Sequence, residues 1–381
     1  MMKLLEAKDR SIREAALNTL LASVHVRTAR ALAPGLLAAV NSTGTKRRTI
    51  FDAKRNLTPF GELVRGEGGP ASPDQAVNDA YDGIGLTYDF YLEEFNRNSL
   101  DGNGMRLDAV VHYGDRVNNA FFDGTRMLFG DGDGARFINL TKSPDVIAHE
   151  LTHGVTRFTA GLDYHKQSGA LNESVSDVFG SLVKQWAQNQ DAQSADWLIG
   201  DGIFTPAISG DALRSLKAPG TAYNNPLFGE DPQPDHMSKF VPLPDTQAGD
   251  NGGVHINSGI PNHVFFLLAI AIGGKAWDIP GHIWYDTLVN RVGEFAQFED
   301  FAKATYEGAG SLYGTAEQSA VRDAWSKVGI EIDFGASLRA SKDSPKSRKG
   351  GARVDTESLA ELHARLDRLA KRVDEIAKKL P

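Results

Sequence analysis

Residues 149–153 read His-Glu-Leu-Thr-His, with the two histidines four residues apart. Two histidines four residues apart share one face of a helix, so both imidazoles can reach a single divalent cation. Ser143 as N-cap and Pro144 at the first helical position predict that a helix begins here. Glu150 faces the same cation away from the ligand axis, where a carboxylate can accept a proton from an activated water. The stretch predicts half of a zinc site, His149 and His153, with a base beside it.

Residues 169–177 read Gly-Ala-Leu-Asn-Glu-Ser-Val-Ser-Asp and are typical of the start of a second helix. Glu173 and Asp177 lie four residues apart on one face of it. Glu173 can add an oxygen to the two histidine nitrogens, which leaves a fourth zinc position open, and Asp177 can fix the tautomer of a liganding histidine. The alternative is that the histidines and Asp177 are ordinary surface residues, which requires both spacings to be coincidences.

On these residues the sequence resembles the thermolysin family of zinc metallopeptidases, and within it the protealysin-like branch with a short propeptide. The resemblance also rests on residues 154–156, 160–164 and 250–259, and it covers about Ile50 to Ile332. The aminopeptidase type of zincin would place its third ligand one residue closer and carry Gly-Ala-Met-Glu-Asn; this sequence has neither. The resemblance implies an α+β fold of two lobes, a β-rich N-terminal one and a mainly α-helical C-terminal one, joined by the zinc-binding helix with the active-site cleft between them.

The resemblance also implies roles for residues around the metal ligands. Tyr164 and His255 would hydrogen-bond the oxyanion of the tetrahedral intermediate, because a donor placed opposite the metal stabilises the charge that develops there. Asp250 would orient His255, and Asn172 and Asp177 would support the ligands from outside. A lone histidine in a glycine-rich loop is more often structural, so the interpretation of His255 depends on the surrounding Asn-Gly-Gly-Val-His-Ile-Asn-Ser.

Substrate contacts are implied in the same way. Residues 118–122 match the family's edge strand, on which Asn119 and the carbonyl of Ala120 would hold an extended peptide through backbone hydrogen bonds; the plainer interpretation of Asn-Asn is a turn. Arg214 would grip a substrate carbonyl beyond the scissile bond. A specificity pocket would select large apolar residues on the amino side of the new N-terminus, and it would be formed by Phe137, Leu140, Val146, Ile199, Ile203 and Leu213. Some of these are also explained as plain core.

Calcium is where this chain departs from the better-known members of the family. Asp145, Asp196 and Asp201 remain from a double-calcium site, but Lys184 and Leu198 stand where glutamates are expected. A lysine can replace the charge of a cation but cannot ligate one, so the double site is expected to be lost. A single Ca²⁺ site near Thr205 and Asp211 is expected to be retained. The glycine-rich run 130–134 lacks the later glutamate of an EF-hand and is interpreted as a turn.

The composition suits a soluble protein of two lobes with extensions. The chain has 381 residues, 41% hydrophobic and 24% charged, with a net charge of −8. No basic stripe with interleaved aromatics suggests a nucleic-acid partner. The absence of cysteine excludes disulfides and cysteine catalysis and leaves the compartment open. The longest apolar run, 264–272, is too short to span a bilayer.

The N-terminal segment, residues 1–48, is interpreted as a short propeptide. Residues 11–33 are compatible with a helix, and Pro34-Gly35 and a polar stretch to residue 49 then suggest an exposed linker that can be cut. The family's proline-rich blocking element is not at the start, which leaves the mode of inhibition open; the alternative is a structural helix that stays attached. Charges interrupt the first ten residues, so no secretory signal is expected, and synthesis would be cytoplasmic with export by a non-classical route left open.

The remaining boundaries follow from pattern and resemblance: a β-rich lobe at 49–157, a helical lobe at 158–335, a flexible linker at 336–354 and a heptad-repeat helix at 355–381. The last segment has an unbroken leucine-rich heptad seam, which favours a coiled coil that makes homo-oligomers. The positions that flank the seam offer no complementary charge pairs between two parallel helices. An amphipathic helix docked on its own chain is the alternative.

The sequence therefore predicts a zinc-dependent neutral endopeptidase that acts on proteins and peptides and is made as a zymogen. One rival is a catalytically silent or permanently capped peptide-binding protein of the same fold. Another is a scaffold in which assembly through the tail is the function. The sequence leaves open the physiological substrate, the activation trigger and the final location.

Overall fold

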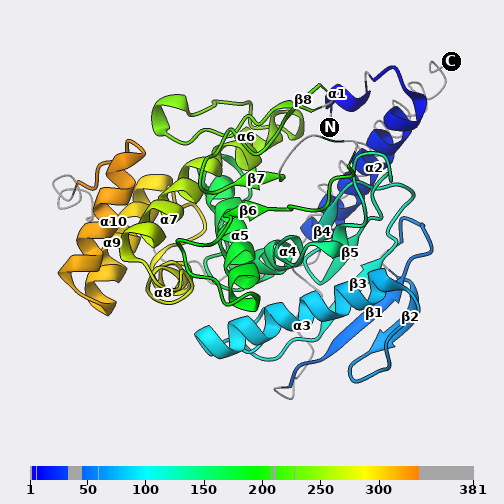
Figure 1. Ribbon diagram of the computed structural model, residues 1–381, viewed down its shortest axis with the longest axis horizontal. Coiled ribbons are helices and arrows are strands. Elements are labelled where there is room, and N and C mark those ends of the chain that lie inside the picture. The colour runs from blue at the N-terminus through cyan, green and yellow to red at the C-terminus, as the bar shows by residue number, and fades with distance from the viewer. Residues whose placement is uncertain are drawn as a thin grey trace, which may run out of the picture. The chain divides into compact units, whose positions relative to one another are not determined.

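The computed structural model describes residues 2–5, 7–32, 45–58, 60–206, 208, 212–226 and 228–333. A five-stranded sheet forms the N-terminal lobe, with the strand order β2-β1-β3-β5-β4. Its central strands β1, β3 and β5 are parallel, and each edge strand pairs antiparallel. The strands are β1 (Arg48–Asp52), β2 (Glu62–Gly66), β3 (Leu107–Val111), β4 (Ala120–Phe122) and β5 (Arg126–Phe129). The long helix α3 (Gln75–Phe95) packs on this sheet, as Figure 1 shows.

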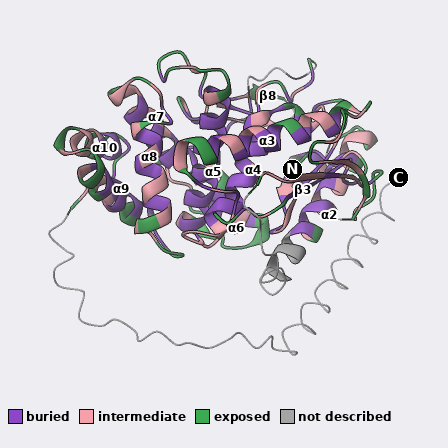
Figure 2. Ribbon diagram, turned by 90° about the horizontal axis from the view of Figure 1, so that it is seen from below, coloured by how far each residue is buried: buried purple, intermediate pink, exposed green. Residues whose placement is uncertain are grey.

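Two antiparallel helices at the centre of the molecule, α4 (Pro144–Arg157) and α5 (Lys166–Ala187), carry the predicted metal ligands. Both are mainly buried (Figure 2). Ser143 is the N-cap of α4 as predicted, although its hydroxyl bonds Asp145 rather than a backbone N–H. Helix α5 begins three residues earlier than the expected Gly169. The two helices approach closely at Gly180, where a Cβ would lie 2.7 Å from the Asp145 carbonyl oxygen.

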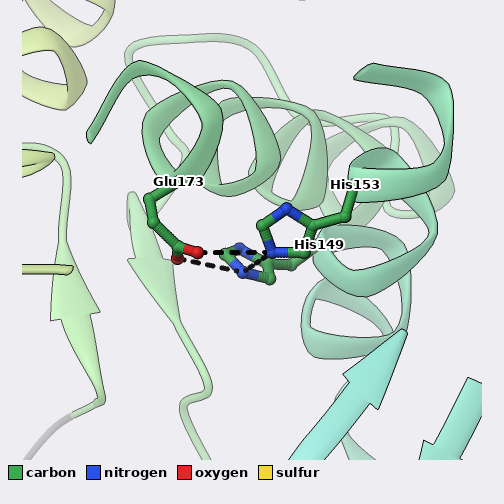
Figure 3. Close-up of side chains that lie close together, drawn as sticks. All are labelled: His149, His153 and Glu173. Atoms are coloured by element: carbon green, nitrogen blue, oxygen red, sulfur yellow. Dashed lines mark hydrogen bonds and ion pairs between the residues drawn. The ribbon is translucent and has the colours of Figure 1, made fainter. Parts of the chain in front are cut away.

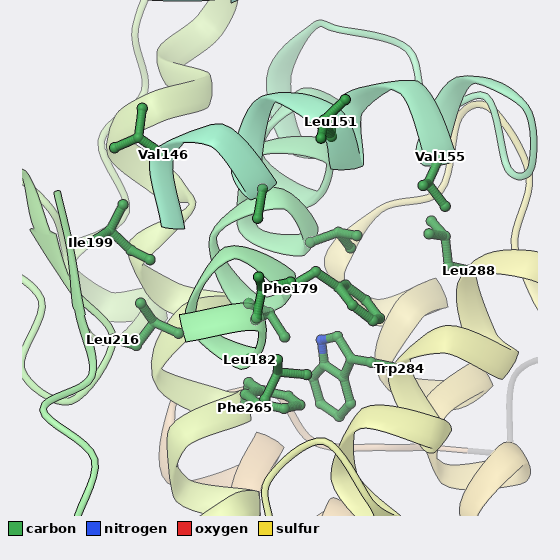
Figure 4. Close-up of a cluster of buried hydrophobic side chains, with 14 of the residues drawn as sticks. Val146, Leu151, Val155, Phe179, Leu182, Ile199, Leu216, Phe265, Trp284 and Leu288 are labelled. Carbon is green, nitrogen blue, oxygen red and sulfur yellow. The ribbon is translucent and has the colours of Figure 1, made fainter. Parts of the chain in front are cut away.

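The C-terminal lobe is mainly helical, as predicted. After two short hairpins, β6–β7 (Leu198–Ile199, Arg214–Ser215) and β8–β9 (Asn224–Asn225, Gly229–Glu230), it contains α6 (Asp250–Asn257), α7 (Gly259–Ile272), α8 (Ile279–Asp286), the π-helix η5 (Thr287–Arg291), α9 (Phe298–Leu312) and α10 (Thr315–Lys327). Figure 4 shows the core where these helices meet α4 and α5. Burial of large apolar side chains such as Phe179, Phe265 and Trp284 in this core stabilises the two helices that carry the predicted ligands.

Among the described residues, one stretch, Gln247–Ile272, is long and apolar enough to cross a membrane, by length and composition alone. In the structure it comprises the short η4 turn, α6 and α7, and more than half of its most apolar part is buried inside the lobe. Val264, Phe265, Leu268 and Ala269 of α7 are buried in the core. Packing within the protein therefore accounts for the apolar character of this stretch.

The N-terminal segment forms α1 (Met2–Leu5) and α2 (Arg10–Leu32), close to the predicted helix at 11–33. Ala22 and Val26 of α2 pack in a small cluster with Tyr113 and Val117 beside the sheet. The Thr19 hydroxyl accepts a hydrogen bond from the backbone N–H of Asn118 at 2.9 Å. The helix therefore docks at the β4 edge of the sheet (Figure 1).

Contacts with the lobe hold the residues just before the predicted boundary at residue 49. The Lys46 ammonium pairs with Asp89, and the Arg47 carbonyl accepts from the Leu107 N–H at 2.8 Å. We therefore expect any cut in the linker to fall before Lys46. The predicted linker at 336–354 and the heptad helix at 355–381 lie outside the described residues, and both stay predictions.

A histidine ties the sheet to α3 and makes stability depend on pH. Asp131 and Asp74 each accept from His112 at 2.7 Å, and Asp74 is also the N-cap of α3. The hydrogen bond to Asp131 is the main cause that raises the pKa of His112 to about 9, against the smaller effect of burial. A raised folded-state pKa adds stability that is complete below the unfolded value near 6.5 and is lost as pH rises through about 9.

Replacing His112 with Gln is expected to remove this dependence. The free energy of unfolding of the wild type should fall by roughly 1–3 kcal/mol between pH 6.5 and 9 more than that of the variant. Urea unfolding of both proteins across this range, with zinc present, measures the difference. Parallel pH profiles for the two proteins would contradict the assignment.

Candidate active site

The three predicted metal ligands converge, as Figure 3 shows. Nε2 of His149 lies 3.2 Å from Nε2 of His153. Oε2 of Glu173 lies 3.4 Å from the first of these nitrogens, and Oε1 lies 3.4 Å from the second. Tetrahedral zinc with bonds of about 2.0–2.1 Å would hold its ligand atoms about 3.3–3.4 Å apart. The spacing of the donor atoms is therefore close to that of zinc ligands, with one Glu173 oxygen facing each histidine.

The other ring nitrogens fix the tautomers that such a site requires. Nδ1 of His149 donates to Asp177 and Nδ1 of His153 donates to the amide oxygen of Asn172, each at 2.8 Å. The amide nitrogen of Asn172 donates in turn to the Leu162 carbonyl, so the orientation of the amide is set. When the rings are neutral, this tautomer leaves the lone pairs of both Nε2 atoms available to a cation beside Glu173. The outer positions predicted for Asp177 and Asn172 are where the structure places these residues.

Asp177 is fully buried and is held by more partners than the sequence suggested. The Arg214 guanidinium donates to both carboxylate oxygens at 2.7 Å, and the Asn262 amide donates at 2.8 Å. Burial would raise the pKa of Asp177, but Arg214 and His149 outweigh it and hold it at about 2. No local pattern pointed to Asn262, which lies 85 residues away in sequence.

The metal ligands and the charged groups around them shift one another's pKa. Burial would lower the pKa of His149, but the hydrogen bonds to Asp177 and Glu173 raise it to about 10. Burial would raise the pKa of Glu173, yet the nearby histidines, with His255 the largest contributor, keep it well below its usual range. A bound cation would compete with the protons for the same nitrogens.

Tyr164 and His255 meet on the open side of the ligands. The Tyr164 hydroxyl donates to Glu173 and lies 3.2 Å from Nε2 of His255. Asp250 accepts from both the backbone N–H and Nδ1 of His255, at 2.8 and 2.6 Å. The surrounding protein would lower the pKa of His255, whereas the carboxylates of Glu173 and Asp250 raise it to about 9. The side chain of His255 is half exposed, so a ligand can reach Nε2.

A cavity of about 180 Å³ lies in front of the ligands. It brings together Glu150, the oxyanion candidates and Arg214 with most of the predicted substrate residues: Asn119, Ala120, Phe137, Leu140, Val146, Ile203 and Leu213. Ile199 differs, because it is fully buried in the core and does not line the cavity. In the sequence, an apolar residue of the core looks the same as one that lines the cavity, so Ile199 could not be told apart.

The edge strand beside the cavity has the geometry for peptide binding. The Asn119 carbonyl accepts from the Gly130 N–H on the side of β5. Backbone groups of neighbouring strand residues point to opposite sides, so those of Asn118 and Ala120 face the open edge. The N-terminal helix already occupies part of this edge through Thr19, and its Ser23 and Val26 line the cavity. The sequence did not indicate these two lining residues.

Lys184 occupies the centre of the expected calcium cluster. Its ammonium lies 2.8, 3.0 and 3.4 Å from Asp201, Asp196 and Asp145, and it donates to the Leu198 carbonyl at 2.8 Å. The cluster is therefore filled by a lysine. At the other calcium position the Thr205 hydroxyl donates to the Ala135 carbonyl, while Asp211 lies outside the described residues, so that site stays a prediction.

Comparison with known proteins identifies the family. The thermolysin metallopeptidase catalytic domain matches residues 40–157 and the alpha-helical domain of the same family matches residues 160–330. The "Extracellular metalloprotease" of Pectobacterium carotovorum subsp. carotovorum is 49% identical over 290 residues, which are 76% of this chain and 82% of that protein. "Protease PrtS" of Photorhabdus sp. (strain Az29) is 50% identical over 289 residues, 76% of this chain and 77% of that protein.

A solved structure agrees with the sequence matches. The precursor of protealysin, a metalloproteinase from Serratia proteamaculans, superimposes with a TM-score of 0.78 at 44% identity, and the alignment covers 86% of this chain and 97% of that one. The two-lobed fold inferred from the sequence is thereby confirmed. The chain belongs to the thermolysin family of metallopeptidases and is a metalloendopeptidase.

Proposed function

We propose that the protein is a zinc-dependent neutral endopeptidase whose zinc is held by His149, His153 and Glu173. The observation that carries the proposal is the spacing of the donor atoms. The two Nε2 atoms lie 3.2 Å apart and each lies 3.4 Å from one of the two Glu173 oxygens, while hydrogen bonds at Nδ1 hold both rings. When bound, zinc polarises the scissile carbonyl and lowers the pKa of the attacking water. The alternative, a silent peptide-binding protein, would have no need of Glu150 and His255 beside such a site.

The chain's own residues would then move protons and stabilise charge. Glu150 accepts the proton of the attacking water and passes it to the leaving amine. His255 and Tyr164 donate hydrogen bonds to the oxyanion, and Asp250 holds His255 in the orientation this requires. Asp177 and Asn172 keep the two liganding imidazoles in place.

The substrate would bind as an added strand along β4, with Asn119 and the outward-facing carbonyl of Ala120 holding its backbone. Arg214, anchored on Asp177, faces the same cavity and would hold a substrate carbonyl. Phe137, Leu140, Val146 and Leu213 give one wall of the cavity an apolar surface. We therefore expect cleavage before large apolar residues such as Leu, Phe or Ile.

The N-terminal segment would act as a cap that makes the protein a zymogen. Thr19 accepts from an outward-facing N–H of the edge strand, and Ser23 and Val26 narrow the cavity. A substrate strand and α2 compete for this edge. The similar solved structure is that of a precursor, and a relative is named an extracellular metalloprotease. Both support a segment that is removed and action outside the cell. Oligomers through residues 355–381 remain part of the proposal.

Zinc removal tests the proposal. The purified protein should cleave a quenched peptide with a Gly-Leu bond at neutral pH, lose that activity with a zinc chelator and regain it when zinc is added back. A chelator selective for calcium is the control and should leave cleavage unchanged. Intact mass should show loss of a fragment ending before Lys46 as activity appears. Cleavage that no chelator affects would rule out the zinc mechanism; no cleavage after the cap is lost would favour the peptide-binding alternative.

A further inference from the structure

The glycine-rich run 130–134 follows β5 and is more than a turn. The Gly130 N–H donates to the Asn119 carbonyl and the Gly132 N–H to the Val117 carbonyl, both at 3.0 Å. Gly132 has a φ of +72°, and a Cβ there would lie 2.4 Å from the Phe137 carbonyl oxygen. Only glycine permits this approach. The turn thus touches the chain leading into β4 on one side and Phe137 on the other.

One carboxylate in this turn joins the two sides. Oδ1 of Asp133 accepts the backbone N–H groups of Ala135, Arg136 and Phe137, at 3.0, 2.7 and 3.2 Å. Oδ2 accepts from the Asn118 amide at 3.0 Å and from Nε of Arg136 at 2.6 Å. Its side chain and that of Arg136 are each only 1% exposed. One oxygen therefore shapes the turn, and the other holds the segment that leads into the edge strand.

The residues that Asp133 contacts belong to two walls of the cavity, the edge strand and the apolar wall. Asn118 directly precedes Asn119 and Ala120, and all three line the cavity, as does Phe137 from the opposite side of the turn. An extended substrate must meet the strand edge with its backbone and the apolar wall with a side chain at the same time. A shift between the two walls would therefore weaken binding, even with the zinc ligands in place.

We propose that Asp133 is a positioning residue that holds the substrate-binding edge strand and the apolar wall of the cavity in register. The inference rests on the proposed function, because it takes Asn119, Ala120 and Phe137 as substrate contacts. Asp133 touches neither the metal ligands nor Glu150. Its effect is therefore exerted through Asn118 and Phe137.

Replacing Asp133 with Asn separates its two tasks. The amide oxygen of the new side chain can still accept hydrogen bonds from the three backbone N–H groups. Its NH₂ group, in contrast, faces the donors of Asn118 and Arg136 and cannot accept their hydrogen bonds. For a quenched peptide that extends on both sides of the cleaved bond, KM is expected to rise about tenfold, with kcat changed less than about twofold. A short peptide that barely reaches the strand should show a much smaller rise. These constants are measured on the full chain after self-processing, with zinc content recorded.

Asn118→Ala breaks the same contact from the strand side, leaves the turn intact, and carries the test if the first variant does not fold. The two changes should not add: the double variant should have the KM of the more affected single one. Asp131→Asn is the matched control, since Asp131 lies in the same turn but holds His112, and its KM should equal that of the wild type.

An unchanged KM in Asp133→Asn, equal losses for long and short peptides, or fully additive effects would each overturn the inference while leaving the proposed function standing. A wild type without chelator-sensitive cleavage would overturn the proposed function, and this inference with it.

Discussion

Replacing Glu150 with Gln is expected to lower kcat/KM for a Gly-Leu peptide by about 10²–10⁴-fold, because a positioned proton acceptor contributes that much. Glutamine keeps the size and polarity of the side chain but cannot take the proton of the attacking water. Glu150 lines the cavity with the metal ligands, whereas the three converging donor atoms come from His149, His153 and Glu173. The zinc content of the variant should therefore equal that of the wild type.

The measurement pairs initial rates of cleavage with zinc content determined on the same samples. Glu93→Gln is the matched control, because this glutamate is exposed on α3, and it should leave both quantities unchanged. A Glu150→Gln protein that cleaves at the wild-type rate would remove Glu150 from the mechanism. A variant that loses its zinc would instead make Glu150 a ligand or a support of one.

Sequence signals that lie within a few residues were reliable for this chain. The spacing of His149 and His153, the Ser-Pro start of their helix and the four-residue step from Glu173 to Asp177 are all local, and the structure places these side chains together. Periodicity also located the N-terminal helix at 10–32 to within a residue of the expectation. Helix boundaries with weaker signals were less accurate, as the start of α5 at Lys166 shows.

Contacts between distant segments could not be derived from one sequence. Asn262 reaches Asp177 across 85 residues and Thr19 reaches Asn118 across 99, and neither side chain differs locally from an ordinary asparagine or threonine. The run 130–134 was interpreted as a turn, but its contacts with Asn118 depend on the order of strands in the sheet. That order mixes parallel and antiparallel neighbours, which no local pattern specifies.

Local pattern alone did not predict the role of Lys184. Resemblance to the family supplied the expected cluster, and the charge of a lysine predicted that it would replace the cation there. The structure places its ammonium against three aspartates and a carbonyl. Asp145, at the start of the metal-binding helix, is fully buried, and its second oxygen also accepts from the Gly200 N–H. Burial raises the pKa of Asp145, and the lysine is the main influence that opposes it. Lys184 therefore joins α4, α5 and the loop after β6.

Replacing Lys184 with Met is expected to reduce the free energy of unfolding by about 3–5 kcal/mol, because a buried carboxylate loses its counter-ion. The side chain keeps its length, so lost packing contributes little. The variant leaves an oxygen cluster that suits a hard cation, and Ca²⁺ should restore part of its lost Tm. In the wild type the lysine fills this cluster, so added Ca²⁺ should raise its Tm less than that of the variant.

Thermal and urea unfolding with zinc held constant measure both effects. Lys239→Met is the matched control: that lysine pairs with Asp235 at the surface with its side chain 64% exposed, and its loss should cost less than about 1 kcal/mol. Equal stability of the Lys184 variant and the wild type would mean that the aspartates need no internal cation. A rise in Tm with Ca²⁺ that is as large in the wild type as in the variant would show that an ion, rather than the lysine, holds this part of the fold together.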